Sequence, residues 1–224
     1  MTTALEKKRL LYLSLLVAIF LLNDLPLMHA KSYTLWIFID YAVRVLVLSL
    51  ITYLVLEKGA KISEFGLVPI KIKDGIEWSL LLSLIGVLID QIVWRFFEYN
   101  LPQTKMMSFP APTSSILNVI DLTFGLILVS FSEELVFRGY FCTVAKGFLK
   151  NKTAVMVLAA LAFGLSHWSL GLHAIITTGL WGILPMIALM KTGSIIPALV
   201  SHYVTNLVAF SGIIPDNIFS YLKL

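Results

Sequence analysis

Four polar side chains lie inside long apolar stretches of the C-terminal half of the chain: Glu133, His167, His202 and Asn206. A carboxylate beside an imidazole is able to hold a water molecule and remove its proton. A second imidazole with a carboxamide is able to donate hydrogen bonds to a developing oxyanion. These residue types are therefore sufficient to hydrolyse an amide without a covalent intermediate, if the fold brings them together.

A second carboxylate, Glu134, directly follows Glu133, and Arg138 comes four residues after Glu134. Residues four apart share one face of a helix, so we expect Glu134 and Arg138 to form an ion pair and Glu133 to be left for the chemistry. The alternative is a structural charge cluster that holds helices together. A structural pair needs only one carboxylate, and charges in hydrocarbon are costly, which favours a functional role for the other.

The composition indicates an integral membrane protein. Of the 224 residues, 58% are hydrophobic and 13% are charged, whereas soluble domains have about 45–50% apolar and about 25% charged residues. A single cysteine, Cys142, excludes a disulfide framework within the chain. The net charge of +4 is interpreted as a property of the loops of a membrane protein. We therefore expect contact with membrane lipids and no nucleic-acid partner.

Seven apolar segments indicate an all-α fold, a polytopic bundle of about seven to eight transmembrane helices in a single domain, residues 1–224. In lipid only helices and closed barrels satisfy the backbone, and these runs are too long and too continuously apolar for barrel strands. The sequence does not decide whether there is an eighth helix, since the tail from Pro215 to Leu224 could fold back. The segments span about residues 10–28, 34–56, 78–97, 116–145, 153–168, 173–190 and 195–214.

Two stretches between these segments, residues 57–78 and 98–115, are polar or rich in proline. We expect the second to be a loop, and the first to be an interfacial loop or a short amphipathic helix. Lysine and arginine are concentrated in alternate loops, so the positive-inside rule predicts a cytoplasmic N-terminus. The compact chain without an organelle-targeting segment leads us to expect a multi-pass protein of a bacterial cell membrane.

Two further pairs of opposite charge lie in the N-terminal half of the chain. Asp40 and Arg44 are four residues apart, and Asp90 is followed by Arg95. Both pairs lie outside the segments that contain Glu133 and the two histidines. We therefore interpret them as structural ion pairs between or within helices.

Three short motifs occur in order on the last four apolar segments: EELVFR at 133–138, FGLSH at 163–167 and HYVTN at 202–206. As Glu-Glu-x-x-x-Arg, Phe-x-x-x-His and His-x-x-x-Asn, they resemble the family of CAAX proteases and bacteriocin-processing enzymes. This family is also called the Abi family of intramembrane proteases, and it includes the prenyl-protein endopeptidase. The resemblance covers residues 115–210, a core of helices that carries the catalytic motifs.

The resemblance implies an intramembrane, glutamic-type endopeptidase that cleaves a peptide or protein substrate close to the membrane. It implies that Glu133 and His167 activate the water, and that His202 and Asn206 form the oxyanion hole. Three positions have supporting roles in this scheme: Glu134, Arg138 and Phe163.

No cofactor is expected. Two histidines and a glutamate are a possible zinc ligand set, but the chain lacks the His-Glu-x-x-His helix of common zinc proteases, so zinc is the lesser alternative. Two other functions are open: a catalytically silent membrane scaffold or regulator, and a transporter whose intramembrane charges carry protons or ions. The sequence has no internal repeat of the kind found in many transporters, which disfavours the second.

Overall fold

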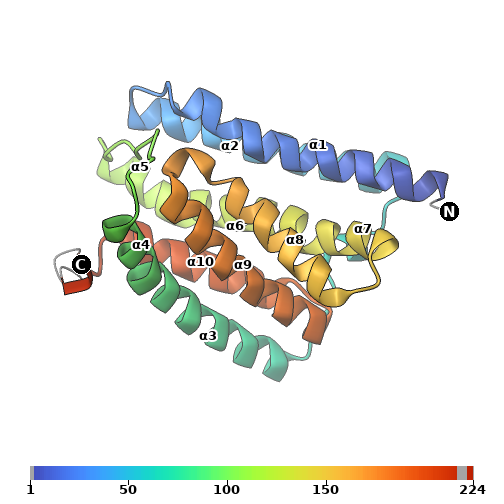
Figure 1. Ribbon diagram of the computed structural model, residues 1–224. Helices are drawn as coiled ribbons and strands as arrows, with labels where there is room; N and C mark the ends of the chain where they lie inside the picture. The colour runs from blue at the N-terminus through green and yellow to red at the C-terminus, as the bar shows by residue number, and fades with distance from the viewer. Residues whose placement is uncertain (1–2, 216–220, 224) are drawn as a thin grey trace.

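The structure, a computed structural model, describes residues 3–215 and 221–223. Within these residues the chain is helical and has no strand, which confirms the all-α membrane bundle expected from the sequence (Figure 1). Five helical stretches of the described chain are long and apolar enough to cross a membrane, and two apolar helices are shorter. The seven stretches are Ala4–Leu27, Tyr33–Lys58, Ile72–Asn100, Ser115–Phe148, Leu172–Thr192, Lys152–Leu165 and Ile196–Ser211.

Each of these stretches corresponds to one apolar segment of the sequence, and three-turn or longer α-helices make up most of them. Three of the seven also contain or adjoin short 3₁₀ or π-helical segments. The α-helices of the described residues are α1 (Ala4–Leu27), α2 (Tyr33–Lys58), α3 (Ile72–Leu88), α4 (Arg95–Asn100), α5 (Ser115–Ile120), α6 (Leu126–Glu134), α7 (Phe141–Phe148), α8 (Lys152–Leu165), α9 (Leu172–Thr192) and α10 (Ile196–Ser211). The other helical segments are the 3₁₀ helices η1 (Ile62–Phe65) and η5 (Trp168–Leu170) and the π-helices η2 (Ile89–Trp94), η3 (Asp121–Gly125) and η4 (Leu135–Tyr140).

Local sequence signals set the ends of the helices that position the site. The Ser32 side chain accepts a hydrogen bond from the N–H of Leu35 at the start of α2, and Gly59 ends that helix in the left-handed conformation. The side chain of Asn151 accepts hydrogen bonds from the first turn of α8. These caps satisfy backbone groups that the helix itself leaves free.

The third helix begins six residues earlier than the sequence analysis placed it, at Ile72 and not near Trp78. Its first turns are amphiphilic, and Lys73 and Glu77 face each other four residues apart at 3.8 Å, an arrangement compatible with a helix. The preceding stretch is accordingly shorter than predicted. It holds the 3₁₀ helix η1 and irregular chain, as expected of a loop, and has no α-helix of its own between α2 and α3.

Helix α6 lies at the centre of the bundle, with α2 packed on one side and α10 on another. Helices α1 and α2 run side by side along one side of the molecule, and α3 lies along the opposite side against α10 (Figure 1). Buried apolar side chains of α1, α2, η4, α8 and α9 form the main core. This enclosure removes the carboxylates at the end of α6 from the lipid-facing surface, so that Glu134 is fully buried.

The N-terminus and residues 221–223 lie at opposite ends of the bundle (Figure 1). This placement agrees with an odd number of crossings in the described chain. The eighth helix considered for the tail falls largely on residues 216–220 and 224, which lie outside the described residues.

A glycine at position 139 permits η4 to touch the 3₁₀ helix η1. A Cβ atom added there would overlap the backbone of Phe65. We expect Gly139→Ala to destabilise the protein by about 1–3 kcal/mol through overpacking, which corresponds to a loss of about 2–4 °C in Tm per kcal/mol for a chain of this size. Thermal unfolding in detergent measures the change.

Gly75→Ala is the matched control, because the nearest atom to an added Cβ is Ile70 Cγ2 at 3.4 Å. Gly75 lies in the first turns of α3, where alanine is the better helix former, so its Tm should be unchanged or slightly higher. Equal Tm values for the two variants would contradict the close approach of η4 to η1.

Candidate active site

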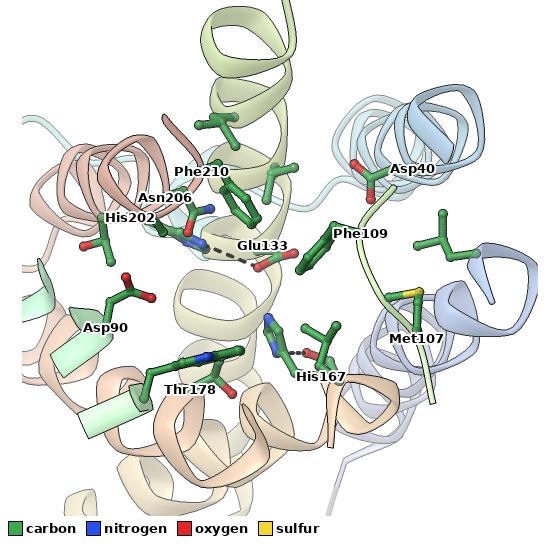
Figure 2. Close-up of a pocket in the computed structure, with 18 of the residues that line it drawn as sticks. Asp40, Asp90, Met107, Phe109, Glu133, His167, Thr178, His202, Asn206 and Phe210 are labelled. Atoms are coloured by element: carbon green, nitrogen blue, oxygen red, sulfur yellow. Dashed lines mark hydrogen bonds and ion pairs between the residues drawn. The ribbon is translucent and has the colours of Figure 1, made fainter. Parts of the chain in front are cut away.

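The four residues that could perform hydrolysis line one cavity of about 510 Å³. Glu133 comes from α6, His167 from the turn after α8, and His202 and Asn206 from successive turns of α10. Figure 2 shows their side chains around a common space at the centre of the bundle. The structure thus brings together residues that are far apart in the sequence, as the sequence analysis required.

The imidazole of His202 lies between the two glutamates. Its Nδ1 is 2.8 Å from Oε1 of Glu134, and its Nε2 is 3.7 Å from Oε2 of Glu133. A carboxylate only accepts hydrogen bonds, so Nδ1–H donates to Glu134. This contact fixes the orientation of the ring and directs Nε2 toward Glu133 and the cavity.

The predicted ion pair of Glu134 and Arg138 is confirmed, with Nη1 of the arginine 3.1 Å from Oε1 of the glutamate. The guanidinium group lies over the ring of Phe163 at 3.9 Å and near that of Trp181 at 5.1 Å. Only 1% of Arg138 is exposed. The pair is therefore shielded from solvent on all sides, and its charge is compensated by Glu134 and by the faces of two aromatic rings.

Phe163 forms the wall against which both imidazoles pack. Its ring centroid is 4.9 Å from that of His167 and 5.9 Å from that of His202, both in edge-to-face geometry. Together with its contact to Arg138, this makes Phe163 the side chain that connects α8 with α10 and η4. The sequence predicted a packing position beside the site, and the contacts agree with it.

The backbone at the end of α8 orients His167. Its Nδ1 lies 2.9 Å from the carbonyl oxygen of Phe163 in the last turn of the helix, and that oxygen also accepts hydrogen bonds from the N–H and the hydroxyl of Ser166 at 3.2 and 2.7 Å. A carbonyl oxygen accepts, so Nδ1 carries the proton and the neutral ring presents an unprotonated Nε2. That nitrogen is able to accept a proton from a bound water in the cavity.

Asn206 lies one turn after His202 on α10 and lines the same cavity. Among the described residues its carboxamide makes no hydrogen bond, in contrast to the two histidines. Its N–H groups are therefore free to bind an oxygen atom of a ligand, beside Nε2 of His202.

The sequence analysis missed the role of the N-terminal pair Asp40 and Arg44. The pair itself is confirmed, with Nη2 of Arg44 3.0 Å from Oδ1 of Asp40. The same guanidinium group also contacts Glu133, with Nη1 2.6 Å from Oε1. Both residues line the cavity, so the pair lies at the candidate site and not apart from it. Spacing identified the partners within α2, but it gave no signal for the contact with α6.

The second N-terminal pair is not formed as predicted. The carboxylate of Asp90 accepts a hydrogen bond from Nε2 of Gln91 at 2.6 Å, and Arg95 forms an ion pair with Glu98 at 3.1 Å. The π-helical turn η2 lies between Asp90 and Arg95 and changes the angular spacing that an α-helix would give. All four side chains line the cavity, and Figure 2 shows Asp90 on the side away from Asp40.

The irregular segment 101–114 confirms the predicted loop and also covers the cavity. The backbone N–H groups of Met106 and Met107 donate to the carbonyl of Ser169 at 2.8 and 3.1 Å. The ring of Phe109 packs edge-on against Trp36 at 5.4 Å and Phe210 at 5.2 Å. Figure 2 shows Met107 and Phe109 on the side of Glu133 that faces Asp40. The loop therefore gives one side of the site an apolar wall.

The zinc alternative depends on how the possible donor side chains are arranged around the cavity. In the part of the chain that the structure describes, no group of three or more His, Cys, Asp or Glu side chains is arranged to hold a metal ion. Oε1 of Glu133 contacts Arg44, and Nδ1 atoms of both histidines face protein acceptors. The Nε2 atoms of both histidines remain directed at the cavity, so the absence of zinc stays a prediction.

The ion pair of Glu134 and Arg138 supports the fold around the site. Arg138→Met should reduce the yield of folded protein and destabilise it by about 3–5 kcal/mol, because Glu134 would keep a buried charge without a partner. The double variant Glu134→Gln, Arg138→Met removes both charges, and the amide still accepts from His202. Its folded yield, measured by size-exclusion chromatography in detergent, should exceed that of the single variant. An equal or lower yield would contradict the compensation.

A comparison with protein families agrees with this geometry. The family model described as type II CAAX prenyl endopeptidase Rce1-like matches residues 115–208. The matched range contains the four residues of the cavity that could perform hydrolysis, and also Glu134, Arg138 and Phe163. No curated protein and no solved structure matches the chain. Residues 115–208 are thus similar to the Rce1-like family of type II CAAX prenyl endopeptidases, in agreement with the resemblance of the three motifs.

Proposed function

We propose that this membrane peptidase hydrolyses a peptide bond by direct attack of a water molecule, without a covalent intermediate and without a cofactor. The observation that carries the proposal is the composition of the cavity wall. A carboxylate oxygen of Glu133, the unprotonated Nε2 of His167 and the free carboxamide of Asn206 face one space. The match to the family model supports peptide hydrolysis, and the side chains suggest how it proceeds.

Glu133 and His167 would activate the water. Oε2 of Glu133 makes no hydrogen bond among the described residues, and Nε2 of His167 is left free by the contact of Nδ1 with Phe163. Together they bind a water and take its proton as its oxygen attacks the carbonyl carbon. The proton then passes to the amide nitrogen, which leaves as an amine when the carbon–nitrogen bond breaks.

His202 and Asn206 would stabilise the oxyanion of the tetrahedral intermediate. Both lie on α10 one turn apart, so Nε2 of the imidazole and the carboxamide N–H group reach the same side of the cavity. Nε2 donates when the ring carries a proton on both nitrogens, with Nδ1–H held by Glu134. Donors fixed before the reaction stabilise developing charge without reorganisation.

The substrate would be a peptide or protein with a cleavage site near the membrane. The cavity volume of about 510 Å³ lies in the usual range of ligand sites, about 300–1,000 Å³, and accommodates a short extended segment. The family description names a prenylated substrate. The side chains around this cavity do not require the substrate to be prenylated.

We also propose that the N-terminus faces the cytoplasm of a bacterial cell. Several basic residues gather near the end of the bundle at which the chain begins. Arg9 forms an ion pair with Glu64 at 2.7 Å, and α1 packs against α7, which ends in the basic segment around Lys146. By the positive-inside rule, the end of the bundle that carries these basic residues faces the cytoplasm.

Glu133→Gln should abolish cleavage while the protein still reaches the membrane, because the amide does not accept the proton of the water. Peptide termini from membranes and medium of cells with wild-type or variant protein, compared by mass spectrometry, measure the effect and identify the substrate. Glu77→Gln, at an exposed glutamate of α3, is the control and should retain every fragment. Identical fragment sets for wild type and Glu133→Gln would favour a scaffold or a transporter.

The two histidines and the asparagine should differ in the size of their effects. His167→Ala and His202→Ala should remove detectable cleavage, and Asn206→Ala should lower the rate about 10²–10³-fold, as expected for one oxyanion donor. His29→Ala, in the exposed turn after α1, is the control. Rates are measured with purified protein and the peptide identified above, with and without a zinc chelator. Loss of cleavage in the chelator would overturn the metal-free reaction.

A further inference from the structure

Five of the buried charged side chains form ion pairs with one another at the end of α6 and beside it. Three are carboxylates and two are guanidinium groups, so the cluster has a net charge of −1 when all are ionised. They form two units, one across α2 and α6 and one within α6 and η4, and His202 lies between them. The five are Asp40, Glu133, Glu134, Arg44 and Arg138.

The unit across α2 and α6 is held by one arginine. The guanidinium of Arg44 contacts Glu133 through Nη1 at 2.6 Å and Asp40 through Nη2 at 3.0 Å, and lies 5.0 Å from the ring of Phe20. Exposure is 7% for Arg44, 3% for Asp40 and 5% for Glu133. In this shielded setting an ion pair is screened little by water, so its geometry is well defined.

Because of Arg44, the two carboxylate oxygens of Glu133 have different surroundings. Oε1 is occupied by the guanidinium group, and Oε2 makes no hydrogen bond among the described residues and lies 3.7 Å from Nε2 of His202. A glutamate side chain that lacked this contact would rotate more freely, and a buried carboxylate without a cation would take up a proton or seek another partner. Either change would remove the base from its position.

Asp40 prevents Arg44 from cancelling the charge of Glu133. The three side chains carry two negative charges and one positive charge, so one negative charge remains on the unit. Asp40 also fixes the second edge of the guanidinium group, four residues before Arg44 on the same helix. The arginine is therefore held from the side opposite the site.

We propose that Arg44, held by Asp40, is a positioning residue that fixes Glu133 in its carboxylate form with Oε2 directed at the attacking water. The inference rests on the proposed function for the role of Glu133. It assigns to α2 a part of the active site that lies outside residues 115–208, the range matched by the family model. The base of the reaction would then depend on a helix from the N-terminal half of the chain.

An apolar carbodiimide tests the ion pair without any substrate, because such reagents add to protonated carboxyl groups in apolar surroundings. Labelling of Glu133 in purified protein at neutral pH is measured by mass spectrometry of its peptides. We expect little label in the wild type, at least fivefold more in Arg44→Gln, and an intermediate amount in Arg44→Lys, which keeps a charge but loses the two-sided contact. Unchanged labelling in folded Arg44→Gln would overturn the proposal.

Cleavage kinetics with the peptide identified for the wild type test the positioning role. Arg44→Gln should lower kcat at least tenfold with little change in KM, and Arg44→Lys should recover part of kcat. If Arg44→Gln folds poorly, the double variant Asp40→Asn, Arg44→Gln removes both charges and should show the same loss of kcat. Wild-type kcat in either folded variant would overturn the positioning role.

The two readouts separate this inference from the proposed function. If Glu133→Gln still cleaves, the assignment of Glu133 as the base is wrong, and the positioning role falls with it, while the labelling result continues to report on the ion pair. If Glu133→Gln is inactive and Arg44→Gln is fully active, only the positioning role of Arg44 is wrong.

Discussion

The structure depends on the compensation of charge in a medium that does not solvate it. A carboxylate inside a membrane bundle is stable only with a cation or several hydrogen-bond donors beside it. Arg138 and His202 contact the carboxylate of Glu134, and Arg44 contacts that of Glu133. Because these partners come from different helices, satisfying the two adjacent glutamates requires α2, α6, η4 and α10 to meet at one depth. The same contacts that make the charges tolerable build the site.

Aromatic packing extends this constraint to the remaining helices. Arg138 lies against Phe163, and that ring in turn contacts both imidazoles. The end of α8 thereby contacts the charge cluster, and the carbonyl oxygen of Phe163 orients His167. When packing and supporting hydrogen bonds hold a reacting group in place, the group needs little rearrangement during catalysis. The site is accordingly placed on helices and helix ends, and the irregular segment 101–114 contributes mainly apolar cover.

Polar chemistry in this position also requires water to reach the centre of the bundle. The cavity is lined by charged and polar groups such as Asp90 and Asn206, and also by the aromatic side chains of Trp36, Phe109 and Phe210. Such a division allows a water to bind near Glu133 while an apolar part of a peptide contacts the aromatic side chains. The π-helical segments η2 and η3 contain acidic residues that line this space, Asp90 and Asp121, and π-bulges are frequent at functional sites.

The sequence by itself determined the seven helical stretches, because hydropathy and helix length are local properties, and it determined the pairs within a helix, Glu134 with Arg138 and Asp40 with Arg44. The motifs also predicted which residues share the cavity. Only the tertiary structure decided that Arg44 contacts Glu133, that segment 101–114 covers the site, and that Asp90 has Gln91 as its partner. Periodicity shows which side chains share a face, but which faces meet depends on packing between helices distant in the sequence.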